Sequence, residues 1–183
     1  MAFMMETDRL ILQVEKEDIA DQLLDFYIRN RKQFERFEPT RPNNFYTLAY
    51  QKASLRYEYN EIMHGKCLRY YLYAKEQPDV LIGSVNFSNF VHDPFSHTSI
   101  GYKLDHAAQK KGYAYEACTA AIPVIFHDYK IHRIEARVAP DNDPSIRLLK
   151  RLHFSFEGIE YQGIQIQGTY KDHYRYGLIS TIQ

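Results

Sequence analysis

The sequence predicts a domain of the α+β class, in which helices flank a mixed β-sheet. Its 183 residues suit one sizeable core, so we expect residues 1–183 to form a single domain. Hydrophobic residues make up 45% of the chain and charged residues 25%, which is typical of globular proteins and argues against disorder. The hydrophobic pattern also changes repeatedly between the helical and the strand period.

The first third of the chain predicts one strand and two helical regions. Residues 10–14 are largely apolar and suit a strand, and a helical pattern begins at Glu15. Prolines and asparagines in residues 38–46 predict a loop that ends this first helical region. Thr47 is a suitable cap for a second helix, which is expected to run to about Gly65.

The remaining residues predict most of the sheet and two further helices. The longer helix is expected over residues 112–128 and the shorter one over 144–151. The order along the chain is therefore strand, two helices, three strands, helix, strand, helix, two strands, which indicates a mixed sheet. The strands expected in this part span residues 67–74, 80–87, 98–104, 131–138, 154–161 and 172–179.

Composition narrows the classes of partner and location. Lysine plus arginine and aspartate plus glutamate both number 23, so a nucleic-acid partner is not expected. The apolar runs are too short for a membrane span, and the first residues do not resemble a signal peptide, so we expect a cytoplasmic protein. Cys67 and Cys118 lie far apart without metal-ligand spacing, so no metal site is expected.

The segment that connects residues 98–104 to the next helix predicts an anion site. A strand ends at Leu104, a polar loop with Lys110 and Lys111 follows, and a helix begins at or just after Gly112. The first amides of a helix have no internal partners and lie at the positive end of its dipole, so such a loop can bind a phosphate group. The alternative is a solvated basic loop before an ordinary helix.

The loop Gln109-Lys110-Lys111-Gly112-Tyr113-Ala114 resembles the cofactor motif of the GNAT acetyltransferases, Gln/Arg-x-x-Gly-x-Gly/Ala. Residues 100–104 resemble the strand that precedes this motif in the family, and residues 142–145 resemble its Asn-x-x-Ser turn. The likeness spans residues 7–180. Residues 85–91 are particularly similar to the ribosomal-protein-alanine N-acetyltransferases of the RimJ type.

This resemblance implies a mostly antiparallel sheet and acetyl-CoA as the co-substrate, bound where two central parallel strands splay apart. The strands would be residues 98–104 and 131–138. Ordinary sheet pairing, or a purely structural turn at Asn142, is the alternative. The residues implied to bind the co-substrate are Tyr102, Lys103 and Leu104 through the strand, Gln109, Lys110, Lys111, Gly112, Tyr113 and Ala114 around the pyrophosphate, and Asn142.

The implied reaction is direct attack of an amine on the thioester. Ser145 is the expected donor to the leaving thiolate, although it also suits the start of a helix whose cap would be Asp143. Many relatives have a glutamate where this chain has Ser99. Glu135 is therefore a candidate base, unless it is an ion-paired strand residue. Asn86 or Tyr170 could instead order a water molecule.

The acceptor remains open between three interpretations. The first is the N-terminal α-amine of a protein, in particular a ribosomal protein, with a homodimer as one arrangement of the enzyme. The second is a small amine such as a polyamine, amino acid or antibiotic. The third is an acyl-CoA-binding module without catalysis, for which the missing carboxylate at Ser99 is the support. The acceptor cleft is expected between the first two helices, residues 38–46 and residues 90–98.

Overall fold

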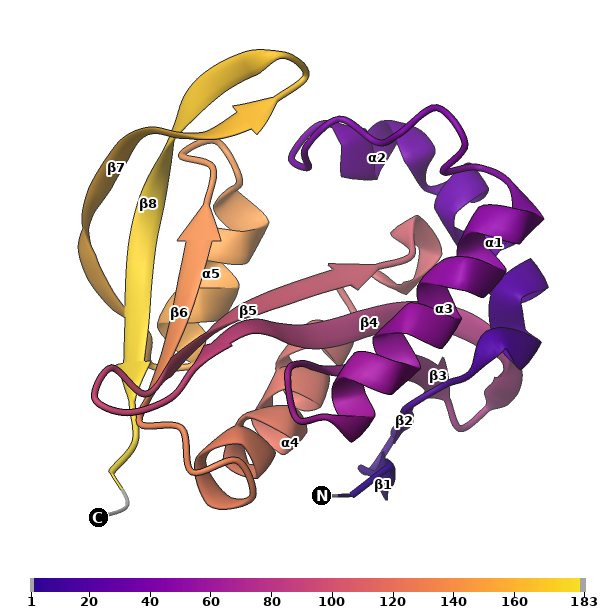
Figure 1. The fold of residues 1–183 in the computed structure, drawn as a ribbon, viewed down its shortest axis with the longest axis horizontal. Coiled ribbons are helices and arrows are strands. Elements are labelled where there is room, and N and C mark those ends of the chain that lie inside the picture. The colour runs from indigo at the N-terminus through magenta and orange to yellow at the C-terminus, as the bar shows by residue number, and fades with distance from the viewer. Residues whose placement is uncertain (1, 182–183) are drawn as a thin grey trace.

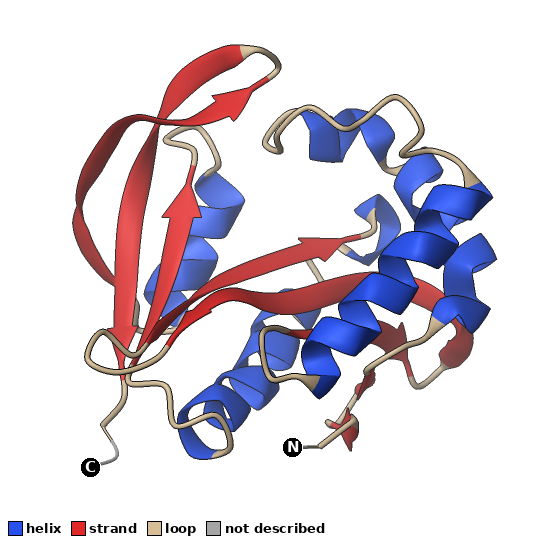
Figure 2. Ribbon diagram, in the orientation of Figure 1, coloured by secondary structure: helices blue, strands red, loops and turns tan. Residues whose placement is uncertain are grey.

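The computed structural model describes residues 2–181, and within them eight strands form one mixed sheet (Figure 1). Helices lie on both sides of this sheet, which confirms the α+β prediction (Figure 2). The strand order is β1-β2-β3-β4-β5-β6-β8-β7. The strands are β1 (Met4–Glu6), β2 (Leu10–Gln13), β3 (Leu68–Ala74), β4 (Gln77–Val91), β5 (His97–Leu104), β6 (Arg133–Val138), β7 (Ser155–Ile166) and β8 (Thr169–Ile179).

The helical region expected from Glu15 onwards is divided at Asn30. The buried Asn30 amide donates to the Phe26 carbonyl and to Asp105, both at 2.9 Å, and its oxygen accepts the His106 amide. This side chain ends one helix and ties the break to the end of β5. The helices are α1 (Ala20–Arg29), α2 (Arg31–Glu35), α3 (Leu48–Met63), α4 (Tyr113–His127) and α5 (Asp143–Arg151), with 3-10 turns η1 (Glu17–Ile19) and η2 (His106–Ala108).

The last two strands form a longer hairpin than the sequence pattern predicts. β7 and β8 pair as far as Ile166 and Thr169, so the hairpin includes residues 162–171, which were expected to form a loop. Gln167 and Gly168 connect the strands with φ angles of 50° and 79°, the left-handed values of a two-residue hairpin turn. The extended hairpin curves towards α2 (Figure 1).

The central strands β5 and β6 separate along their length. They are parallel and pair at His97 with Arg133, Thr98 with Ile134 and Ser99 with Glu135. Beyond Ser99, β5 stays paired with β4 as far as Leu104, whereas β6 follows β8. Figure 1 shows the resulting gap, which widens towards the carboxyl ends of both strands. The splayed pair implied by the family resemblance is present.

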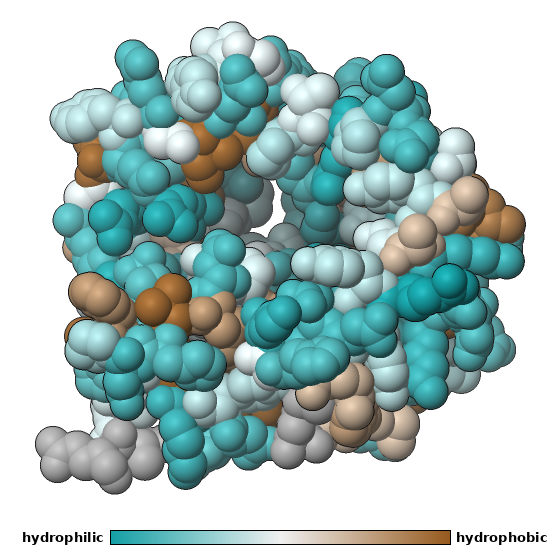
Figure 3. Space-filling model, viewed as in Figure 1, coloured by the Kyte–Doolittle hydropathy of each residue, from teal (hydrophilic) through white to brown (hydrophobic). Residues whose placement is uncertain are grey.

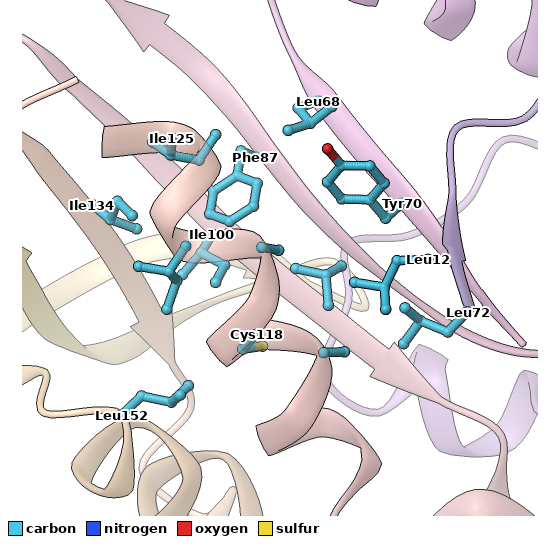
Figure 4. Packing of buried hydrophobic residues seen from close by; sticks show 14 of the residues in the cluster. Leu12, Leu68, Tyr70, Leu72, Phe87, Ile100, Cys118, Ile125, Ile134 and Leu152 are labelled. Atoms are coloured by element: carbon cyan, nitrogen blue, oxygen red, sulfur yellow. The ribbon is translucent and has the colours of Figure 1, made fainter. Parts of the chain in front are cut away.

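The sheet buries different cores on its two faces. On one face, α4 packs Cys118 and Ile125 against strand residues that include Phe87 and Ile100 (Figure 4). On the other face, α1, α2 and α3 cover Tyr71, Tyr73 and Leu81. Because side chains alternate along a strand, Tyr102 of β5 joins the α4 core while Lys103 lies on the α1 face. The β5–β6 gap therefore lies between two differently built surfaces.

Candidate active site

The loop between β5 and α4 has the backbone conformation of an anion site. Gly112 is the N-cap of α4 and has φ +85°, and Lys110 also has a positive φ of 59°. The Glu116 amide is the one that bonds back to the Gly112 carbonyl, at 3.1 Å. The amides of Tyr113, Ala114 and Tyr115 therefore belong to the first turn, where a helix has no internal acceptors. Glycine adopts the left-handed conformation without strain, which explains why residue 112 is a glycine.

The side chains of this loop divide between solvent and packing. Lys110 and Lys111 are exposed and form no ion pair within residues 2–181, so both ammonium groups are available to an anion. The Tyr113 ring is buried beneath the Arg9 guanidinium, and its hydroxyl donates to Glu76 at 3.2 Å. Tyr113 can therefore contribute its backbone amide to a ligand, whereas its side chain fixes the helix start.

Tyr102 and Ser145 form a hydroxyl pair across the gap. The Tyr102 hydroxyl lies 2.6 Å from Ser145 Oγ and 3.4 Å from the Ser145 carbonyl oxygen. Ser145 lies in the first turn of α5, where its amide donates to Asn142 Oδ1 at 3.3 Å. Asn142, and not Asp143 as expected, is therefore the cap of this helix. Burial raises the pKa of Tyr102, which keeps the phenol protonated near neutral pH.

Glu135 occupies the closed end of the gap, next to Ser99. Its Oε1 lies 3.0 Å from Arg133 Nε and 3.6 Å from Arg175 Nη2. Burial would raise the pKa of Glu135, but the hydrogen bond and charge of Arg133 outweigh it and hold the pKa below its usual range. A carboxylate stabilised in this way is a poor proton acceptor, so the geometry favours the ion-paired alternative over the predicted base.

The two residues considered for ordering water occupy different places. Asn86 pairs with Gly101, and a Cβ built on Gly101 would lie 2.9 Å from Asn86 Oδ1. The Asn86 amide therefore lies over the backbone of β5, on the same face as Ser99. Tyr170 is 60% exposed near the tip of the β7–β8 hairpin and is not at the closed end of the gap.

The Lys103 side chain lies on the face of the sheet that α1 covers. Its Nζ is 2.5 Å from Glu38 Oε1, and Glu38 also pairs with Arg41. The ammonium group lies 5.3 Å from the ring centroids of both Tyr27 and Phe34. Burial disfavours its charged form and lowers the pKa of Lys103 to about 8. The Lys103 backbone remains next to the gap, but the side chain belongs to the opposite face from Tyr102.

A groove of 360 Å³ lies between α2 and the β7–β8 hairpin. Figure 3 shows the surface hollowed in this region. Arg36 pairs with Asp141 across it at 3.0 Å, and Gln167 Nε2 donates to the Glu35 carbonyl at 3.0 Å. Residues 90–98, expected to border the acceptor, instead lie at the closed end of the gap, where His97 pairs with Arg133. Residues of the β7–β8 hairpin line the groove instead.

The described residues give no support for a metal site, a cysteine nucleophile or a membrane-spanning helix. In residues 2–181, no group of His, Cys, Asp and Glu side chains is arranged to hold a metal ion. Burial raises the pKa of the Cys118 thiol and raises that of Cys67 to about 11, so neither is primed as a nucleophile. Over the same residues, the helices are too short or too polar to cross a membrane.

Comparison with known proteins agrees with this geometry. Residues 9–155 match the acetyltransferase (GNAT) domain family. The chain is 33% identical over 169 residues to the [ribosomal protein uS5]-alanine N-acetyltransferase of Escherichia coli, covering 91% of this chain and 86% of that protein. It is also 33% identical over 154 residues to the probable N-acetyltransferase YjcK of Bacillus subtilis, covering 84% of each.

A solved structure shows the same fold along almost the whole chain. The ribosomal-protein-S5-alanine acetyltransferase of Vibrio fischeri superimposes with a TM-score of 0.93 at 27% identity, covering 99% of this chain and 98% of that one. Mycobacterium smegmatis RimJ in complex with CoA-disulfide has the same fold, with a TM-score of 0.87 at 21% identity. The match covers 95% of this chain and 84% of that one. The chain therefore belongs to the GNAT acetyltransferase family and is an acetyl-CoA-dependent N-acetyltransferase.

Proposed function

We propose that this enzyme acetylates the N-terminal α-amine of a protein, with a ribosomal protein as the acceptor class. The proposal rests on one arrangement: a hydroxyl pair lies on one face of the β5–β6 gap, and a groove bridged by Arg36 and Asp141 lies beyond the end of β6. The two relatives that act on ribosomal protein alanine support the choice of acceptor. Such an acceptor is made in the cytoplasm, where we place the reaction.

The donor side of the gap fits acetyl-CoA. The amides of Gly112, Tyr113 and Ala114, with the exposed Lys110 and Lys111, would hold the pyrophosphate. The edge of β5 beyond Ser99 has left β6, so backbone groups on this edge would pair with the amides of the pantetheine arm, apart from the Leu104 carbonyl, which accepts from Gln33 Nε2 at 3.3 Å. Gln109 leads into the loop, and Asn142 holds the first turn of α5 towards the same side.

The Tyr102–Ser145 pair would donate a proton to the leaving thiolate. When the acceptor nitrogen bonds to the thioester carbonyl, the C–S bond breaks and the sulfur gains negative charge. Tyr102 is protonated at neutral pH, so the pair can supply a hydrogen bond and then the proton. The sequence prediction assigned this role to Ser145 alone and gave Tyr102 only a backbone role.

A strong base is not required for an α-amine. With a pKa of about 8, roughly a tenth of α-amines are neutral at pH 7, whereas lysine amines with a pKa near 10.4 are almost fully protonated. A water molecule held by Asn86 near Ser99 would be sufficient to accept the remaining proton. The absence of a carboxylate at residue 99 is therefore compatible with N-terminal acetylation.

The charges of the α1 face disfavour a polyamine. Carboxylates that could attract several ammonium groups already have cationic partners: Glu38 pairs with Lys103 and Arg41, and Glu58 pairs with Arg69 at 2.9 Å. The groove is also bounded by exposed side chains of both signs, among them Arg36 and Asp141. Such a surface suits an extended peptide better than a small polycation.

An acceptor screen tests this function directly. The purified protein is incubated with acetyl-CoA and peptides that begin with Ala or Ser, and CoA release is measured. The controls are the same peptides with blocked N-termini and internal lysines, and spermidine. We expect transfer to free N-termini and at least tenfold slower transfer to the controls. Equal rates on blocked lysine peptides would refute the α-amine assignment. Acetyl-CoA binding without CoA release on any acceptor would indicate a binding module.

A further inference from the structure

A hydrogen-bonded network joins the turn before β2 to the predicted pyrophosphate loop. Thr7 Oγ1 donates to Glu116 Oε1 at 2.6 Å, and the Arg9 amide donates to the same oxygen at 2.9 Å. Arg9 Nε and Nη2 lie 2.7 and 2.6 Å from Glu116 Oε2. Arg9 Nη1 donates to the Lys111 carbonyl at 2.9 Å. Residues separated by more than 100 positions therefore meet at this loop.

The arrangement has more contacts than a single surface ion pair, with the Arg9 side chain 50% exposed. Both Glu116 oxygens are bonded, and its side chain is 16% exposed. The Arg9 guanidinium also lies 4.8 Å from the Tyr113 ring centroid, so it is held on two sides. Burial would raise the pKa of Glu116, but the bonds from Thr7 and Arg9 outweigh it and lower the pKa. The carboxylate therefore stays charged and keeps Arg9 in one orientation.

The Lys111–Gly112 peptide is the part of the loop that Arg9 controls. In a planar trans peptide, the C=O and the following N–H point in opposite directions. The bond from Arg9 to the Lys111 carbonyl therefore directs the Gly112 amide to the other side. Arg9 Nη2 also lies 3.3 Å from a Cβ built on Gly112, so it packs against this residue. Lys110 has a positive φ angle, which is strained for a residue other than glycine, so the loop needs such external support.

We propose that Arg9, held by Glu116, is a positioning residue that orients the amides of the loop for the pyrophosphate of acetyl-CoA. The inference rests on the proposed role of the loop. It differs from a direct electrostatic role, in which the Arg9 charge alone would attract the pyrophosphate. In a positioning role, removing the Glu116 charge weakens binding even though the cation remains. In a direct role, the same change leaves binding equal or stronger.

The test compares two acetyl donors. Acetyl-CoA contains the diphosphate, whereas S-acetylpantetheine has the thioester and the pantetheine arm without it. We expect Arg9→Ala to raise the KM for acetyl-CoA about tenfold, because charge-assisted hydrogen bonds are lost, with kcat within about twofold. Arg9→Lys and Glu116→Gln should raise this KM about threefold to tenfold. The kinetic constants with S-acetylpantetheine should not change in any of the three.

Arg56→Ala is the matched control. Arg56 forms a similar two-nitrogen contact with Glu17, at 3.0 and 2.6 Å, but on α3. Its removal should leave both donors unaffected. Equal losses with both donors, or an unchanged KM for acetyl-CoA in Arg9→Ala, would overturn the proposal. Weaker binding in Arg9→Ala but not in Glu116→Gln would also overturn it, in favour of direct attraction.

Failure of the positioning role of Arg9 can be distinguished from failure of the proposed function. Titration of the unmodified enzyme with CoA tests the donor site without an acceptor, and the acceptor screen tests transfer. If neither CoA binding nor transfer is found, the proposed function fails. If both are found and the variants behave like the unmodified enzyme, only the positioning role fails. Should Arg9→Ala not fold, Arg9→Lys and Glu116→Gln retain the test, with melting temperatures as the check on folding.

Discussion

The two sides of the β5–β6 gap are built in different ways. The proposed donor side consists of backbone: the positive φ of Gly112, the first amides of α4 and the edge of β5 that has left β6. The proposed acceptor side consists of side-chain contacts between segments far apart in the sequence, such as Glu38 with Lys103 and Arg36 with Asp141. Backbone recognition suits a co-substrate that never changes, whereas side chains can be exchanged to suit different acceptors.

This difference predicts which substitutions affect which substrate. Changes in the loop before α4 should alter acetyl-CoA binding and leave the acceptor KM unchanged. Changes in the groove between α2 and the β7–β8 hairpin should do the reverse. Changes at the Tyr102–Ser145 hydroxyl pair should lower turnover and leave the affinities for acetyl-CoA and for the acceptor unchanged.

The largest effect is expected at Gly112. Gly112→Trp places a large side chain at φ +85° in the loop, so the amides can no longer surround a phosphate. We expect the Kd for acetyl-CoA, measured by calorimetry, to rise by roughly 100-fold or more, because each charge-assisted bond contributes about 1.5–3 kcal/mol. Gly65→Trp is the control, since Gly65 has φ +69° with no atom within 4 Å of a Cβ there. Unchanged affinity in Gly112→Trp would exclude this loop as the pyrophosphate site.

The second effect separates chemistry from binding. Tyr102→Phe should lower kcat about 100-fold, the lower range for loss of a general acid, and Ser145→Ala about tenfold. The Kd for acetyl-CoA should change little in either variant. Because the hydroxyls act as one donor, the double variant should lose little more than Tyr102→Phe alone. Losses that multiply would show that the two hydroxyls act independently, and an unchanged kcat in Ser145→Ala would leave Ser145 as a helix-start residue only.

The sequence predicts the backbone of the proposed donor side well because its determinants are local. Gly112, the lysines before it and the strand ending at Leu104 lie within a short stretch, and the structure has the helix start and the splayed strand there. The fold class was predicted for the same reason, since most strands and most helices have a clear period, although the short strand β1 was not predicted. Asn30 was the local exception, because the tertiary bonds of its side chain divide the first helix.

The contacts that join distant residues could not be predicted on either side of the gap. The partners Tyr102 and Ser145 are 43 positions apart, and strand alternation does not reveal which face meets α5. Arg9 and Glu116 are 107 positions apart. The longer β7–β8 hairpin did leave a pattern: Ile164 and Ile166 alternate with a polar residue, and Gln167-Gly168 suits a two-residue turn.

A smaller effect is expected at the mouth of the groove. The Arg36–Asp141 pair is exposed, at 63% and 66% of the two side chains, so it contributes about 1 kcal/mol or less. A peptide that enters the groove has to displace it, so Asp141→Asn should lower the acceptor KM by up to about fivefold. The KM for acetyl-CoA should stay constant, and Arg56→Ala again serves as the control. A change in the acetyl-CoA constant alone would contradict the division between the two sides.

The smallest effect concerns stability and pH on the donor side. The pKa of Glu116 is lowered because the bonds from Thr7 and Arg9 outweigh the opposing effect of burial. A carboxyl group with a lowered pKa in the folded state stabilises the protein above its unfolded pKa, about 4.5, and loses this contribution as the pH falls through the folded value. Glu116→Gln should therefore be slightly less stable than the unmodified protein at pH 7, by about 1 kcal/mol or less. The difference in the free energy of unfolding, measured in urea, should shrink below pH 4.5. A difference that stays constant from pH 7 to pH 3 would mean that the charge of Glu116 does not stabilise the loop.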